Sequence, residues 1–196
     1  MSLSDYSALI DALHRTQFGV IVTPPGKRPT FVNAYADRLL ERRDGLLVTD
    51  TGLEASRAAD TRTLRDVIDL ASRRRLAAPA TFLLPREGAP RPLAVLVPTS
   101  NGEPADHATV FVCDPTQPPA IDQGSLCRLF GLTRAEAAFA GLLLIGQTVD
   151  QAAESLFVSV HTVRTHLKRI LLKTDTGRQA ELLRVLLSCS AQIRLD

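Results

Sequence analysis

The sequence predicts an α+β domain followed by an all-α domain. Three observations lead to this prediction. Short apolar, β-prone runs alternate with helical segments in the first part of the chain, whereas helical patterns alone fill the last part. Between them, DPTQPPAIDQGS (114–125) contains three prolines and a glycine, a composition typical of a linker. We therefore expect a first domain over residues 1–115, a linker over 116–127 and a second domain over 128–196.

The first domain is expected to begin with a β-hairpin. FGVIVT (18–23) and TFVN (30–33) are β-prone runs, and PPGKRP between them is a turn. AYADRLLER (34–42) has helical character, and Asp44-Gly45 marks a turn before LLV.

The rest of this domain is predicted to be one helix followed by three strands. Leu64, Val67, Ile68 and Ala71 recur at i, i+3, i+4 and i+7, which indicates an amphipathic helix. Turns rich in Gly and Pro then separate three apolar runs, at 80–84, 92–98 and 108–113. This order predicts one antiparallel sheet of five strands with helices.

The second domain is expected to contain four helices. Thr133 and Glu136 have the spacing of a capping box, and Gly146 is placed to end the helix that they begin. Ser159 is a candidate N-cap for the third helix. The predicted helices cover residues 132–146, 149–157, 159–173 and 178–188.

Helix 159–173 has two different faces. Val163, Leu167 and Ile170 form an apolar face that can pack against the domain, and the opposite face is polar and basic. A short helix, a tight turn and a basic second helix together suggest a helix-turn-helix.

The distribution of charge supports a nucleic-acid partner. Residues 1–117 hold 14 basic and 14 acidic side chains, whereas residues 118–196 hold 9 basic and 7 acidic ones, so the second part carries the whole excess of +2. A localised basic stripe is typical of nucleic-acid surfaces. The stripe consists of Arg164, Lys168, Arg169, Lys173 and Arg178.

In a helix-turn-helix the second helix lies in the major groove. We expect contacts to bases from Arg164, Thr165 and Lys168, because arginine and lysine bind guanine and threonine offers a methyl and a hydroxyl group. Contacts to phosphates would come from the start of the helix and from the flanking basic residues. These are Ser159, His161, Thr162, Arg169, Lys173 and Arg178.

Residues 146–182 resemble the LuxR-type helix-turn-helix of bacterial transcription regulators, and the likeness extends over about 130–188. The resemblance implies that residues 164, 165 and 168 face the bases and that the fourth helix can supply a dimer contact. Asp175 stands where the family usually has glycine, and aspartate tolerates the left-handed conformation, so we expect the turn to be kept. The matching positions are Thr133, Glu136, Gly146, Ala153, Leu156, Ser159, Thr162, Val163, His166, Ile170, Lys173 and 180–182.

Residues 8–113 resemble a PAS domain, in which a hairpin ending in asparagine leads into a short helix. Asn33, followed by Ala34, Ala36 and Leu39, carries this likeness, and we interpret Asn33 itself as a helix cap. The resemblance implies a domain that senses a small molecule, a cofactor or a partner, and no residue indicates which.

Several other classes of protein are disfavoured. There is no apolar run of transmembrane length and no apolar signal core, and three widely spaced cysteines fit a reducing compartment, so we expect a cytoplasmic protein. His161 and His166 do not share a helix face, which argues against a metal site. Gly26-Lys27 lacks the rest of a P-loop. We predict no catalytic residues, no metal and no cofactor.

The sequence therefore predicts a cytoplasmic, homodimeric bacterial transcription regulator that binds double-stranded DNA. RNA polymerase is a further candidate partner, as is a small-molecule or protein signal at the first domain. A sigma-factor-like module, a signalling adaptor that uses its helices for protein contacts, and an enzyme remain as alternatives.

Overall fold

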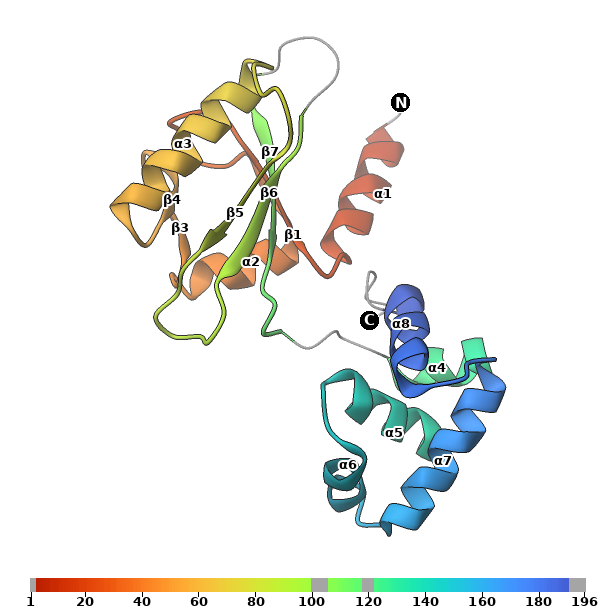
Figure 1. The fold of residues 1–196 in the computed structure, drawn as a ribbon. Coiled ribbons are helices and arrows are strands. Elements are labelled where there is room, and N and C mark those ends of the chain that lie inside the picture. The colour runs from red at the N-terminus through yellow and green to blue at the C-terminus, as the bar shows by residue number, and fades with distance from the viewer. Residues whose placement is uncertain (1–2, 100–105, 118–121, 191–196) are drawn as a thin grey trace. The chain divides into compact units, whose positions relative to one another are not determined.

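A computed structural model describes residues 3–99, 106–117 and 122–190 of the chain. The chain divides into two compact units, residues 1–117 and 118–196 (Figure 1). Residues 118–121 of the predicted linker lie outside the described residues.

The first unit is built on a five-stranded antiparallel sheet with strand order β2-β1-β7-β6-β5. The prediction of one antiparallel sheet of five strands is thereby confirmed. Its central pairing joins β1 to β7, with Ile21 opposite Val110. The strands are β1 (Gly19–Thr23), β2 (Phe31–Val32), β5 (Ala80–Leu84), β6 (Leu93–Val97) and β7 (Ala108–Cys113).

In the part of this unit that the structure describes, three helices and a second, small sheet accompany the five strands. The helices are α1 (Leu3–His14), α2 (Ala34–Glu41) and α3 (Ala58–Ser72), and the small sheet pairs β3 (Leu46–Thr49) with β4 (Gly52–Ala55). Helix α1 and the β3–β4 hairpin add to the elements that the sequence predicted. The hairpin turns at residues 50 and 51, and β4 begins at Gly52, whose φ of 113° and close approach to the backbone of Lys27 exclude a side chain there.

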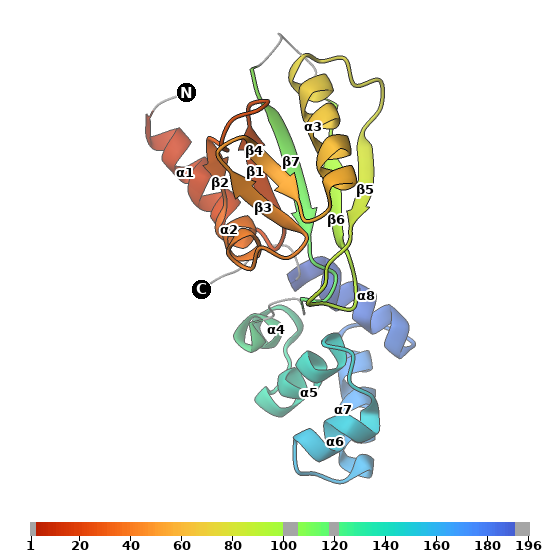
Figure 2. The same cartoon turned by 90° about the vertical axis from the view of Figure 1, so that its left-hand side faces the viewer.

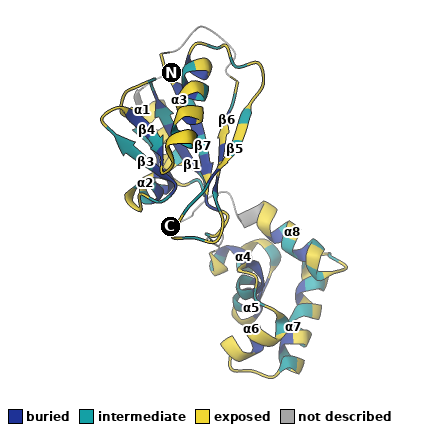
Figure 3. Ribbon diagram, turned by 60° about the vertical axis from the view of Figure 1, so that its left-hand side comes forward, coloured by how far each residue is buried: buried dark blue, intermediate teal, exposed yellow. Residues whose placement is uncertain are grey.

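The core of the first unit lies between the inner face of the sheet and the elements α2, α3 and β3–β4, which share that face in Figure 2. Alternate strand residues point inward, as in β6, where Leu93, Val95 and Val97 are buried and Ala94 and Leu96 are exposed (Figure 3). The opposite, outer face of β5 and β6 therefore presents side chains to solvent.

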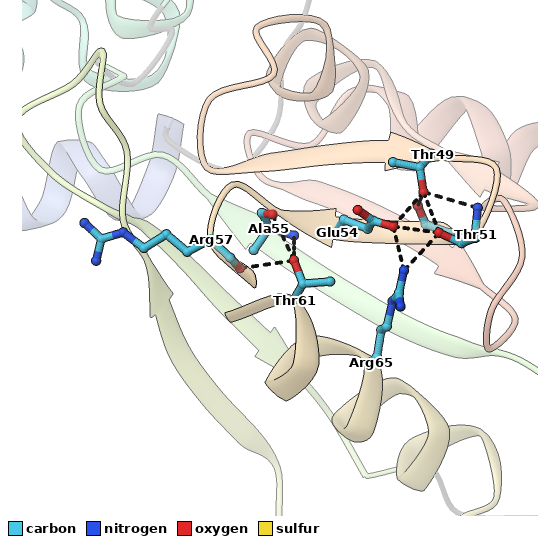
Figure 4. Close-up of polar contacts among 8 residues, drawn as sticks. Thr49, Thr51, Glu54, Ala55, Arg57, Thr61 and Arg65 are labelled. Atoms are coloured by element: carbon cyan, nitrogen blue, oxygen red, sulfur yellow. Dashed lines mark hydrogen bonds and ion pairs between the residues drawn. The ribbon is translucent and has the colours of Figure 1, made fainter. Parts of the chain in front are cut away.

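A polar cluster fastens the β3–β4 hairpin to α3 (Figure 4). The carboxylate of Glu54 accepts hydrogen bonds from the hydroxyls of Thr51 (2.6 Å) and Thr49 (2.8 Å) and from Arg65 of α3 (2.6 Å). These contacts lower the pKa of Glu54, and the hydrogen bond from Thr51 contributes most. Thr61 joins the same elements through both backbone groups of Ala55.

Asn33 connects α1, β1 and α2, and its side chain is fully buried. Its Oδ1 accepts from the amide of Ala36, which confirms the predicted helix cap, and also from the amide of Val20. The two N–H groups of its Nδ2 face three acceptors, each 2.9 Å from the nitrogen, so one of them is shared: the carbonyls of Leu13 and Phe18 and the hydroxyl of Thr16.

A buried ion pair holds the end of β7. Arg86 donates two hydrogen bonds, of 2.8 and 2.7 Å, to the two carboxylate oxygens of Asp114, and both side chains are almost fully buried. Burial alone would raise the pKa of Asp114, but the bonds from Arg86 and Thr116 outweigh it and hold that pKa at about 2. Asp114 also accepts from the amide and the hydroxyl of Thr116, so the chain is fixed as it leaves the sheet.

Within residues 122–190 the second unit contains five helices, one more than predicted. Residues 123–127, which the composition assigned to the linker, lie in α4, where Asp122 caps the first turn through the amides of Gly124 and Ser125. The core of the second unit includes Phe139, Val163, Ile170 and Leu182. The helices are α4 (Gln123–Phe130), α5 (Arg134–Leu144), α6 (Val149–Ser155), α7 (Val160–Lys173) and α8 (Gln179–Ser190).

Candidate nucleic-acid interface

Helices α6 and α7 are joined by a tight turn of four residues, 156–159. The amide of Phe157 donates to the carbonyl of Glu154, and the amide of Val158 donates to that of Ala153, which is the Schellman pattern of a helix end. Phe157 occupies the left-handed position of this motif, with a φ of 55°, and its side chain is 96% exposed. The turn thus sets the start of α7 without a glycine.

The first turn of α7 is closed by Ser159, as predicted. The Ser159 hydroxyl oxygen accepts from the amide of Thr162 at 3.1 Å, and the two hydroxyls of these residues lie 2.8 Å apart. The amides of Val160 and His161, like those at the start of any α-helix, have no acceptor within the helix. They and the helix dipole provide a place for an anion.

The two faces of α7 match the prediction. Val163 and Ile170 are fully buried in the domain core, with Leu167 packed against it. On the other side Arg164, Lys168 and Arg169 are exposed, and within the described residues none of them forms an ion pair.

Thr165 lies between these faces and is half-buried. Its hydroxyl donates to the carbonyl of His161, one helical turn earlier, at 3.0 Å. The side chain is therefore held in one orientation by its own helix, and the hydroxyl oxygen keeps a lone pair for a further contact.

Lys173 is exposed but, unlike Arg164, Lys168 and Arg169, it is paired inside the domain. Its ammonium group donates to Glu136 Oε2 at 2.7 Å and to the carbonyl of Gly131 at 2.8 Å. Two of its three N–H groups are thus used inside the domain, and the predicted phosphate contact stays a prediction that only the third could serve.

Glu136 serves two partners at once. It forms the predicted capping box, accepting from the amide of Thr133 at 2.8 Å, and it also receives Lys173 from α7. The carboxylate is almost fully buried, which would raise its pKa, but the hydrogen bond from Lys173 and those from Thr133 lower it overall. Sequence spacing indicated the cap but gave no sign of the ion pair.

The turn after α7 keeps the expected left-handed residue. Asp175 has a φ of 51°, and the amide of Thr176 donates to the carbonyl of Leu171 to close the helix end. Arg178 follows at the start of α8 and is exposed. It therefore remains free to approach a phosphate beside the groove.

Among the residues that the structure describes, no three His, Cys, Asp or Glu side chains gather as metal ligands would. In the same part of the chain, no helix is both long enough and apolar enough to cross a membrane.

Comparisons with solved structures give low scores over the whole chain. A phage VqmA–DPO complex is 18% identical, with 96% of this chain and 90% of that chain covered, at a TM-score of 0.39. A Vibrio cholerae VqmA–ligand–DNA complex is 13% identical, with 100% of this chain and 91% of that chain covered, and its TM-score is also 0.39. A TM-score below 0.5 does not bear on function, and no curated protein matches the sequence.

The second unit does match a known family. Residues 131–186 correspond to GerE, described as bacterial regulatory proteins of the luxR family, and this range runs from the end of α4 into α8. The resemblance drawn from the sequence is confirmed over this segment. Residues 131–186 form a helix-turn-helix domain of the LuxR family of bacterial regulatory proteins, with α6 and α7 as its two helices.

Proposed function

We propose that the chain is a dimeric, sequence-specific DNA-binding transcription regulator whose helix α7 lies in the major groove. One observation carries this proposal. Arg164, Lys168 and Arg169 lie on the free face of the second helix of a LuxR-family domain, exposed and without ion pairs among the described residues. Surface arginine and lysine without acidic neighbours keep their charge available for a polyanion.

The base contacts follow from the position of each side chain on α7. The major groove is about 12 Å wide and admits an α-helix. Arg164, near the N-terminal half of α7, can reach guanine O6 and N7 with two donors, and Lys168 lies one turn further along the same face. Thr165 is oriented by its bond to His161 and offers its methyl group to a thymine.

Contacts to phosphates would fix the position of the helix along the duplex. At its start, Ser159, His161 and Thr162 surround the free amides of the first turn. On the other flank, Arg169 and Arg178 are exposed. We assign Lys173 to the scaffold instead, because its ammonium group is held by Glu136 and Gly131.

We assign the first unit a PAS-like sensory or dimerisation role. Its five-stranded antiparallel sheet, with helices packed on one face, supports this assignment. A small molecule or a protein partner would act there by binding one arrangement of the dimer better than another, since only differential affinity shifts such an equilibrium. RNA polymerase is a candidate partner at the promoter.

A signalling adaptor that uses the same helices for protein contacts is the second candidate. The unpaired basic face of α7 argues against it, because a protein partner of α7 would need a strongly acidic surface.

The test is selection of random duplex DNA by the full-length protein at several salt concentrations. We expect enrichment of a two-fold symmetric site, with affinity that falls steeply as salt rises. The variant Arg164→Ala/Lys168→Ala should lose the sequence preference while keeping its circular dichroism spectrum. The matched control, Arg62→Ala/Arg75→Ala, removes two exposed charges from the first unit and should keep the preference. Equal DNA binding by both variants would favour the adaptor.

A further inference from the structure

The outer face of the sheet is apolar and open over β5, β6 and β7. These three strands, ATFLL, LAVLV and ATVFVC, contain no charged residue. Leu83 is 60% exposed and Leu96 is 38% exposed. Monomeric proteins rarely leave such a face uncovered. A hollow of about 600 Å³ lies on it, lined by Phe18, Thr81, Leu83, Ala94, Leu96 and Phe111, among others.

Helix α1 presents a second uncovered apolar surface. Tyr6, Leu9, Ile10 and Leu13 follow one helical face at i, i+3, i+4 and i+7, and the first three are 51%, 51% and 43% exposed. An amphipathic helix in water is stable only when its apolar face is packed against something.

Within one chain these two surfaces stay apart. The end of α1 is held near β2, where Asn33 donates to the carbonyl of Leu13 and the amide of Ala34 donates to His14 Nδ1. Figures 1 and 2 show α1 on the side of β1 and β2, away from β5. The helix therefore leaves the outer faces of β5 and β6 uncovered.

We propose that α1 of a second copy lies on the outer face of β5–β7, and that the two copies exchange this contact around a two-fold axis. A single chain carries both halves of the contact, the apolar helix stripe and the apolar sheet face, so a second copy completes both at once. The absence of charge from the three strands favours an apolar partner surface of this kind over a charged one.

The size of the contact fits a reversible dimer. A 12-residue helix is about 18 Å long and about 10 Å wide, so it covers roughly 180 Å² of flat surface. Each copy takes part twice, once with its helix and once with its sheet. This gives roughly 360 Å² of flat surface per partner before the relief of side chains is counted, which is in the range of weak interfaces below about 600 Å² per partner.

This inference rests on the proposed function in one respect: the dimer would bring two recognition helices to two half-sites. Self-association is therefore measured without DNA, by sedimentation velocity of the full-length protein over a concentration series. Leu96→Arg on the sheet and Leu9→Arg on α1 should each raise the dimer dissociation constant at least tenfold. Leu70→Arg on α3 is the matched control, since Leu70 is 40% exposed against 38% for Leu96, and it should behave as wild type. A wild-type monomer at all concentrations, or unchanged dimers of both variants, would overturn the inference.

A second measurement tests the pairing itself. Cys113 is exposed at the edge of the hollow. In a chain with Cys127→Ser and Cys189→Ser, adding Ile10→Cys should give an interchain disulfide on mild oxidation, whereas Leu70→Cys should not. A dimer in solution without the Ile10→Cys crosslink would mean that another surface joins the copies. Binding of each variant to the selected DNA is measured separately, so a failure of the proposed interface can be told apart from a failure of the proposed function.

Discussion

The ammonium group of Lys173 lies 2.7 Å from Glu136 Oε2, although the two residues are 37 positions apart in the sequence. Because Lys173 also donates to the carbonyl of Gly131, the last turn of α7 is fastened to the turn between α4 and α5. The orientation of α7 on the rest of the domain therefore depends on this contact. Its removal should affect DNA binding in a different way from the removal of a phosphate contact.

Lys173→Met should lower the stability of the second unit by about 2 kcal/mol, because it leaves the buried carboxylate of Glu136 without its cation. DNA affinity should fall while its dependence on salt stays the same. Arg169→Met, at an exposed position, is the control and should reduce the slope of log K against log salt by about 0.9 with little loss of stability. A reduced salt slope for Lys173→Met would instead show that Lys173 contacts a phosphate.

Phe157→Gly should raise the stability of the second unit by about 1 kcal/mol. Phe157 holds the left-handed position of its turn at φ 55°, and its side chain is 96% exposed, so glycine relieves the backbone strain and loses little packing. Phe157→Ala keeps a Cβ and should bring no such gain. Thermal unfolding followed by circular dichroism checks both variants, and a lower Tm for the glycine variant would contradict the argument.

The first unit should lose stability between about pH 4 and pH 2. The pKa of Asp114 is about 2 in the folded chain against an ordinary value of 3.8, so the contribution of this carboxylate is complete above its unfolded pKa. As the pH falls toward 2, about 2 kcal/mol is lost.

Urea unfolding at several pH values checks this, followed by tyrosine fluorescence, because Tyr6 and Tyr35 are the two tyrosines of the chain and both lie in the first unit. Asp114→Asn should be less stable at neutral pH and should show a flatter pH dependence. Asp50→Asn, at a side chain that is 98% exposed, should follow wild type. A steep acid loss that persists in Asp114→Asn would assign it to other groups.

Asn33→Asp should separate the two roles of this side chain. The carboxylate can still accept from the amides of Val20 and Ala36, but it can no longer donate to Leu13, Thr16 and Phe18. We expect a loss of about 3 kcal/mol and faster hydrogen exchange in α1, with Asn33→Ala exposing α2 as well. If the amides of α1 were as protected from hydrogen exchange in Asn33→Asp as in wild type, the donor bonds of Asn33 would not hold α1.

Local sequence signals predicted the parts of the fold that depend on neighbouring residues. Thr133, Ser159 and Asn33 cap helices as expected, because a cap involves residues only three positions apart. Helix α4 was missed because the prolines before it suggested a linker and its periodic pattern is only eight residues long. The role of Lys173 could not be predicted from spacing, since its partners come close only when α5 and α7 pack together.

The buried pair of Arg86 and Asp114 also sets the reach of the chain between the units. Thr116 is tied to Asp114, and Asp122 already caps α4, so only six peptide units separate two fixed points. Six residues span at most about 21 Å. In the proposed dimer, two such tethers and the paired first units would join the two DNA-binding domains, so binding of one domain to a half-site would raise the local concentration of the other at the second half-site. The occupancy of a paired operator would then respond to the geometry of the first units as much as to the affinity of either recognition helix.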